Sequence, residues 1–141
     1  MYRIIYLSSA TKLLTDDELH TLLTHSKSNN VKYNITGLLL YIDGDFLQVI
    51  EGEKQTVLNL FELIKMDTRN RSIICVFNEE VNERQFPDWS MGFSQLSYND
   101  LQKIDAFEGI TKKSLSNITD KVAVSFINTF VRSHSNHILF T

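Results

Sequence analysis

A glutamine lies in the middle of one of the most apolar stretches of the chain, FLQVIEG (46–52). In a strand, Gln48 shares a face with Phe46 and Ile50, where a core residue would normally be leucine. A buried amide without hydrogen-bond partners costs about 1–3 kcal/mol. The donors and the acceptor of Gln48 must therefore be occupied, and their partners are the first question that the sequence raises.

Other polar and aromatic side chains fall where a core or a helix end is expected. Tyr6 lies on an apolar face of the first predicted strand. Asn29 and Asn30 close the first predicted helix. Trp89 and Met91 share a face of the last predicted strand. Taken singly, each has a structural explanation: a core tyrosine, a helix stop that tolerates left-handed backbone, and core packing.

The motifs of common catalytic sites are absent. The sequence has no G-x-G-x-x-G, Walker-type loop, G-x-S-x-G or H-E-x-x-H. His20 and His25 are poorly spaced for one helix face, and His134 and His137 have no carboxylate nearby. Cys75 alternates within an apolar strand, which indicates a buried structural thiol. We therefore expect neither a metal site nor a hydrolytic enzyme.

Composition indicates one globular domain with a short appendage. The 141 residues are 43% hydrophobic and 22% charged, enough for a full core. A net charge of −3 without a basic run gives little support to nucleic-acid binding. No apolar stretch approaches the length of a membrane span. A single cysteine is compatible with a reducing compartment, so we expect a cytoplasmic protein.

Hydrophobic periodicity predicts five strands and four helices. Thr15 and Glu18 form a capping-box signature, and Asp43-Gly44 between two apolar runs is a strong hairpin signal. The predicted strands are 2–7, 35–42, 45–51, 72–77 and 89–96, and the predicted helices are 15–28, 53–66, 99–108 and 118–133.

This order predicts an α+β protein. The run LLLYI (38–42) is apolar on both faces, so both sides of its strand should be covered. We expect a ferredoxin-like β-α-β-β-α-β-β arrangement, with a mixed five-stranded sheet and two helices on one face. The C-terminal helical pair would cover the other face. Val122, Phe126 and Phe130 form a stripe that would pack on this sheet, or alternatively on another subunit.

Five segments, in this order and spacing, give the sequence a family resemblance. They are YLSSA, S-x-x-NN-x-x-x-x-ITGLLLY, FLQVIEG, D-x-R-x-R and WSM. Together they resemble the BLUF family, blue-light sensors that use flavin, over residues 2 to about 96. The resemblance implies a sensor domain over 1–97 and a helical extension over 98–141. It implies FAD as the cofactor, with FMN or riboflavin as alternatives.

The resemblance also implies partners for the buried amide. The glutamine matching Gln48 lies between a tyrosine, which Tyr6 matches, and the flavin. Asn30 matches the asparagine that holds the carbonyl edge of the flavin ring. Asn29 and Ser26 match neighbours of the ring. The ring is expected between the two helices that pack on the sheet.

Further positions follow from the same resemblance. Trp89 and Met91 match the mobile tryptophan and methionine of the fifth strand. In D-T-R-N-R, Asp67 and Arg69 match family positions near the flavin or its phosphate tail, although solvated charges are the alternative. Asn70 stands where many relatives have histidine, which puts in doubt any contact of that histidine but not flavin binding.

The implied function is a light-driven switch without turnover. Light would draw an electron and a proton from Tyr6, and Gln48 would rearrange, which would shift the flavin absorption to the red. The fifth strand and the C-terminal helices would pass the signal on. The chain leaves no room for an output enzyme, so we expect a separate protein partner or self-association as a dimer or larger homo-oligomer.

Two alternatives belong to other classes. An acylphosphatase-like enzyme has a similar element order but needs an arginine in its phosphate loop, and YLSSATK contains none. A protein-interaction module without flavin is the other alternative, and the presence of Tyr6, Asn30 and Gln48 argues against it.

Overall fold

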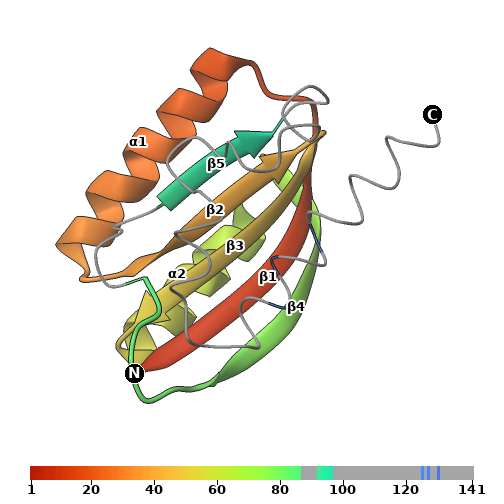
Figure 1. The fold of residues 1–141 in the computed structure, drawn as a ribbon. Helices are drawn as coiled ribbons and strands as arrows, with labels where there is room; N and C mark the ends of the chain where they lie inside the picture. Colours follow the sequence, from red (N-terminus) through yellow and green to blue (C-terminus); the bar gives the residue numbers. More distant parts are fainter. Residues whose placement is uncertain (87–91, 97–124, 126, 128–129, 131–141) are drawn as a thin grey trace.

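The computed structural model describes residues 1–86 and 92–96, and residues 125, 127 and 130. These residues form an α+β fold in which two helices pack on a twisted sheet (Figure 1). In chain order the elements are β1 (Tyr2–Ala10), α1 (Asp16–Lys32), β2 (Thr36–Ile42), β3 (Asp45–Gly52), α2 (Lys54–Met66), β4 (Asn70–Glu80) and β5 (Gly92–Leu96). The predicted α+β class, with two helices packed on the sheet, is confirmed.

The sheet has the strand order β4-β1-β3-β2-β5. The first four strands are antiparallel neighbours, and β5 pairs in parallel with β2. The predicted hairpin between β2 and β3 turns at Asp43 and Gly44, both with positive φ, at 49° and 90°. Gly37 is required in β2 because a Cβ atom there would lie 1.8 Å from the carbonyl oxygen of Val49.

The first helix is longer than its sequence pattern suggests. Its N-terminus has the predicted capping box, in which Thr15 accepts from the amide of Glu18. The helix continues to Lys32, so the interpretation of Asn29 and Asn30 as its stop is wrong. Asn34, with a φ of 55°, adopts the left-handed conformation after the helix instead. Asn30 is thus a buried residue of the helix body.

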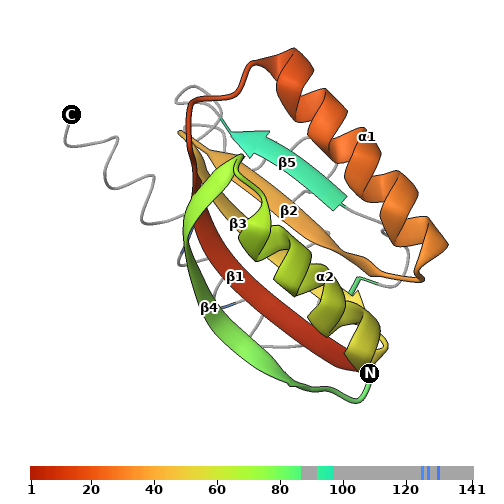
Figure 2. The same cartoon turned by 180° about the vertical axis from the view of Figure 1, so that it is seen from behind.

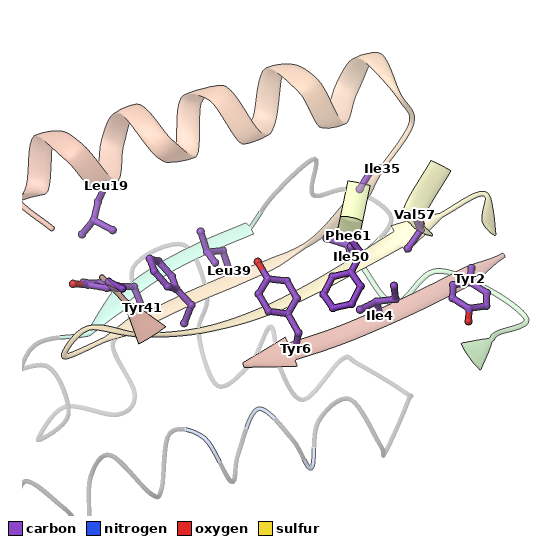
Figure 3. Packing of buried hydrophobic residues seen from close by; sticks show 12 residues of the cluster. Tyr2, Ile4, Tyr6, Leu19, Ile35, Leu39, Tyr41, Ile50, Val57 and Phe61 are labelled. Carbon is purple, nitrogen blue, oxygen red and sulfur yellow. The ribbon is translucent and has the colours of Figure 1, made fainter. Parts of the chain in front are cut away.

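Both faces of the sheet are covered. Figure 2 shows α1 and α2 on the same face, which we call the front face. There the side chains of even-numbered β1 residues, such as Ile4 and Tyr6, pack with Leu19 of α1 and Phe61 of α2 (Figure 3). On the back face, Ile5, Leu40 and Leu47 form a second buried cluster with Phe86, Ile127 and Phe130. Two arrangements were considered for the stripe that contains Phe130, packing on this sheet or on another subunit. Phe130 packs on the sheet.

Strand β4 is an edge strand with two register shifts. They fall opposite Ile5/Tyr6 and Leu7/Ser9 of β1, and Ser72 at the second shift has a φ of 55°. Cys75 lies between them and is exposed, so its interpretation as a buried thiol is wrong. The alternation of apolar residues predicted the strand, but the edge position leaves much of it in contact with solvent.

Several predictions fall outside the described residues. They concern Trp89, Met91, the helix 99–108 and most of the helix 118–133, including Val122 and Phe126. Within the part of the chain that the structure describes, no helix combines the length and the apolar character needed to cross a membrane.

Candidate functional site

Tyr6 and Gln48 form a buried pair in the centre of the front face. They are directly opposite in the β1–β3 register, and the Tyr6 hydroxyl donates a hydrogen bond to Gln48 Oε1. Their side chains are only 5% and 7% exposed. The ring of Phe61 packs against the Tyr6 ring, with centroids 5.5 Å apart. The first partner of the glutamine is therefore the tyrosine on the neighbouring strand.

The environment of Tyr6 keeps its phenol neutral. Burial raises the pKa of the hydroxyl well above its ordinary value of 10.0, and the negative charge of Asp67 raises it further. The phenol is therefore protonated at any physiological pH. Its proton lies in a hydrogen bond that points toward an amide oxygen, so the pair can move a proton along a defined path.

A cavity of about 240 Å³ opens beside this pair. Its walls come from the sheet, from one face of α1 and from the C-terminal half of α2. In Figure 3 the Tyr6 hydroxyl points away from β1 on the side of the sheet where α1 lies. The lining residues are Tyr6, Ser8, Leu22, His25, Ser26, Asn29, Asn30, Leu39, Phe46, Gln48, Leu60, Leu63, Ile64, Asp67, Arg69 and Asn70.

All eight residues predicted to contact a cofactor line this one cavity. Four of them are on or beside the helices' inner faces: Ser26, Asn29 and Asn30 on α1, and Asp67 at the end of α2. Ser26 and Asn30 are one turn apart, which places them on the same face of α1. Asn30 is 3% exposed, whereas Asn29 is exposed. The helix thus places the buried amide of Asn30 in the wall of the cavity and the exposed amide of Asn29 at the rim of the cavity.

Asp67 and Arg69 form an ion pair at the end of α2. Arg69 Nη2 lies 2.6 Å from Asp67 Oδ2, and the arginine side chain is about half exposed. The hydrogen bond from Arg69 lowers the pKa of the Asp67 carboxyl, and the same bond raises the pKa of the guanidinium. Both residues line the cavity, so a ligand would meet a paired arginine there and not a solitary cation.

The structure adds lining residues that the sequence interpretation missed. Ser8 is two positions beyond Tyr6 in β1, so strand alternation alone could have placed it on the same face. His25 precedes Asn29 by one helical turn, and the same kind of spacing indicates it. Apolar lining comes from residues such as Leu22 of α1 and Leu60 and Ile64 of α2, which pack against the front-face cluster. Trp89 and Met91 stay outside the described residues.

The donor set suits a flat, polar-edged aromatic ligand such as a flavin. The helices supply apolar walls, while the amides of Asn30 and Gln48 supply a polar edge. Two buried polar atoms of lining residues, Ser8 Oγ and Asn70 Oδ1, have no hydrogen-bond partner among the residues that the structure describes. Buried polar atoms are seldom left unpaired, which favours a cavity that holds a polar ligand.

Comparison with known proteins identifies the family. The family model described as "Sensors of blue-light using FAD" matches residues 1–92, and the chain therefore belongs to the BLUF family. A solved structure of BlrB, a BLUF protein in its dark state, is 31% identical with a TM-score of 0.66, over 73% of this chain and 76% of that one. A bacterial light-regulated adenylyl cyclase gives 28% identity and a TM-score of 0.66, over 99% of this chain and 35% of the other.

Curated relatives are much longer than the matched region. The photoactivated adenylate cyclase subunit beta of Euglena longa is 32% identical over 89 residues, which are 62% of this chain and 10% of that protein. The chain thus spans about a tenth of the length of the curated relatives it matches. In the family, the BLUF module is a blue-light sensor and not itself an enzyme, although relatives join it to adenylate cyclases.

Proposed function

We propose that this chain is a flavin-dependent blue-light photoreceptor in which Tyr6 and Gln48 are the light-responsive pair. The observation that supports it best is the buried Tyr6–Gln48 hydrogen bond on the wall of a cavity between two helices. A core that needed only packing would have an aliphatic side chain at position 48. The pair instead combines a neutral redox-active phenol with an amide that can be arranged in two ways.

The flavin ring would lie between α1 and α2. Asn30 would hold its carbonyl edge from the last turns of α1, with Asn29 and Ser26 beside it. At the far end of the cavity, Asp67, Arg69 and Asn70 would contact the ring or its tail. FAD is the form that we propose, since the family is described by it, and FMN or riboflavin share the same ring.

When bound, the flavin would supply blue-light absorption and a strongly oxidising excited state. Tyr6 would give up an electron and pass its proton toward Gln48 Oε1, because losing both together leaves no net charge in a buried site. Gln48 would then rotate or change tautomer and donate to the flavin carbonyl, which shifts absorption to the red. The electron and the proton would return to Tyr6 after Gln48 has rearranged, so the new hydrogen bonds would outlast the charge transfer. Thermal reversal of the Gln48 arrangement would then restore the dark hydrogen bonds.

The signal would leave through β5 and the C-terminal segment. β5 pairs with β2, and the register of β2 to β3 places Leu39 directly opposite Gln48. Ile127 and Phe130 pack on the back face of the same sheet. We propose a ferredoxin-like sensor domain over 1–97, a helical pair over 98–141 on the back face, and Trp89 and Met91 as the residues that respond to Gln48.

Output would pass to a separate protein or through self-association as a homo-oligomer. The relatives with adenylate cyclase in their names support a role in regulating other activities. A cytoplasmic location remains a prediction from the single cysteine.

The absorption spectrum of the purified protein, before and after a blue flash, tests this proposal. We expect flavin bands that shift slightly to the red and recover in the dark. Flavin bands that bleach or stay unmoved would overturn the switch but keep the cofactor. A colourless protein that cannot be reconstituted with any flavin would leave a flavin-free interaction module of the same fold.

A further inference from the structure

Two unpaired polar atoms lie at one end of the cavity. Ser8 is 5% exposed, and its hydroxyl has no hydrogen-bond partner among residues 1–86 and the other described residues. The same holds for Asn70 Oδ1. Both residues line the cavity. The family resemblance assigned no role to Ser8, so its burial needs an explanation of its own.

The strand register brings these two residues to the same face and the same end of the sheet. Asn70 pairs directly with Ala10, which is two positions beyond Ser8 and shares its face. Between them, β4 has a bulge at Ser72, a residue with positive φ. Such bulges commonly redirect side chains beside functional sites. Here the bulge lets the first residue of β4 face the cavity together with Ser8.

The orientation of the Asn70 amide is fixed by its other contacts. Asn70 Nδ2 lies 3.1 Å from the carbonyl oxygen of Asp67 and 3.4 Å from that of Ile64, at the end of α2. Both partners are acceptors, so the atom that faces them must be the amide nitrogen. Oδ1 is therefore the atom left for the cavity, and it can only accept a hydrogen bond.

We propose that Ser8 and Asn70 form a second polar subsite that binds a hydroxyl group of the ligand's side chain. A hydroxyl both donates and accepts, so it can donate to Asn70 Oδ1 and accept from the Ser8 hydroxyl. For the flavin of the proposed function, on which this inference rests, the group is a hydroxyl of the ribityl chain. Ser8 is then a residue that selects flavins by their tail and not by their ring.

The position of Asn30 indicates that Ser8 and Asn70 bind the ribityl tail of the flavin and not its ring. The carbonyl oxygen of Asn30 accepts from the amide of Ile35, just before β2, at the end of the sheet where Thr36 faces Glu51. Ser8 is opposite Phe46, toward the other end of β3. With the donor edge of the ring held by Asn30, the ribityl hydroxyls are the remaining donors that riboflavin, FMN and FAD all share, and one of them can satisfy Asn70 Oδ1.

An exchange experiment with two flavins tests this subsite. The 141-residue chain loaded with riboflavin is equilibrated with lumiflavin, which has the same ring but a methyl group in place of the ribityl chain. Bound flavins are then released and quantified, which gives the preference for riboflavin over lumiflavin. Ser8→Ala and Asn70→Ala are compared with wild type, and Ser9→Ala is the matched control. Ser9 is the adjacent serine, and its hydroxyl already donates a hydrogen bond to Asp45 Oδ1 at 3.0 Å.

We expect Ser8→Ala to reduce the preference for riboflavin about five- to tenfold, the loss of one hydrogen bond, with lumiflavin binding unchanged. Asn70→Ala should do the same, and Ser9→Ala should keep the wild-type preference. An unchanged preference in Ser8→Ala, or equal weakening of both flavins, would overturn the subsite while leaving flavin binding intact. A wild-type protein that binds neither flavin would overturn the proposed function together with the subsite.

Discussion

Strands β1 and β3 place two pairs of buried polar side chains directly opposite each other, on the two faces of the same sheet. Arg3 is opposite Glu51 on the back face, and Tyr6 is opposite Gln48 on the front face. Both pairs interrupt an apolar strand, and all four side chains are buried. From the sequence alone they would look like similar exceptions to a hydrophobic pattern.

The back-face pair is a closed network. Arg3 Nε lies 2.9 Å from Glu51 Oε2, and the two side chains are 1% and 0% exposed. Glu51 also accepts from the backbone amides of Gln85 and Phe86, at 2.9–3.0 Å. Through these bonds the pair fixes the segment that follows β4 against the sheet. Protein groups alone thus compensate both charges.

The front-face pair borders a cavity instead. Its neighbours there include polar atoms without partners among the described residues, Ser8 Oγ and Asn70 Oδ1. Burial of a polar pair therefore does not by itself indicate function. A pair enclosed by protein donors and acceptors is structural, whereas a pair beside unsatisfied polar atoms in a cavity indicates a ligand.

Glu51→Gln should have the largest effect on stability. The change leaves the Arg3 charge buried without its counterion, and we expect the free energy of unfolding to fall by about 3–5 kcal/mol. Urea denaturation followed by circular dichroism measures this loss. Glu53→Gln, at the exposed N-cap of α2, is the control and should lose much less stability. A loss for Glu51→Gln no larger than that of the control would contradict the structural role of the back-face pair.

Asn30→Ala should weaken flavin binding without unfolding the protein. Removing the buried amide that we propose holds the flavin ring should raise the dissociation constant for flavin about tenfold. Fluorescence titration of the reconstituted protein measures the constant. Asn29→Ala is the matched comparison and should have a smaller effect, because Asn29 is at the exposed rim. Equal increases of the flavin dissociation constant in Asn30→Ala and Asn29→Ala would contradict a larger contribution of the buried asparagine.

Alkaline pH should destabilise wild type more than Tyr6→Phe. Burial raises the pKa of Tyr6, so the folded state keeps the phenol neutral while the unfolded chain ionises above about pH 10. The stability that comes from this difference is fully present below that pH and is lost as the pH rises further. Between pH 10 and 11 we expect the stability difference between the two proteins to change by up to about 1.4 kcal/mol. If the urea midpoints of wild type and Tyr6→Phe changed by the same amount between pH 10 and 11, that result would contradict a buried neutral phenol.

Arg69→Gln should have the smallest effect on stability. Its ion pair with Asp67 is partly exposed, so we expect the free energy of unfolding to change by about 0.5 kcal/mol or less. If Arg69 contacts the ligand, flavin affinity should nevertheless fall, whereas Arg71→Gln should leave it unchanged. Retention of flavin during gel filtration separates the two variants. Unchanged retention in both would make Arg69 a solvated charge.

Some features were predictable because short segments determine them. The capping box at Thr15, the Asp43-Gly44 turn and the helix predicted over 53–66 depend on neighbouring residues, and the structure has all three. The helix stop at Asn29 and Asn30 was wrong because tertiary packing buries Asn30 and overrides its preference for turns.

Other features depend on contacts between distant segments. The exposure of Cys75 follows from the edge position of β4, which its alternating pattern does not reveal. The roles considered for Tyr6, Gln48 and Asn30 came from the family resemblance, because each alone has a structural explanation. Ser8 was missed because a serine in a strand is ordinary, and only its unpaired hydroxyl in a cavity makes it notable.

The light-minus-dark absorption spectrum of Tyr6→Phe, measured beside Tyr41→Phe, tests whether Tyr6 is the light-responsive donor. Both tyrosines are buried on the front face, but the Tyr41 hydroxyl accepts from the amide of Leu14 at 3.2 Å and does not line the cavity. We predict that both variants bind flavin, that Tyr41→Phe keeps the reversible red shift, and that Tyr6→Phe loses it. Gln48→Leu should lose it as well. A normal red shift in Tyr6→Phe or in Gln48→Leu would contradict the account.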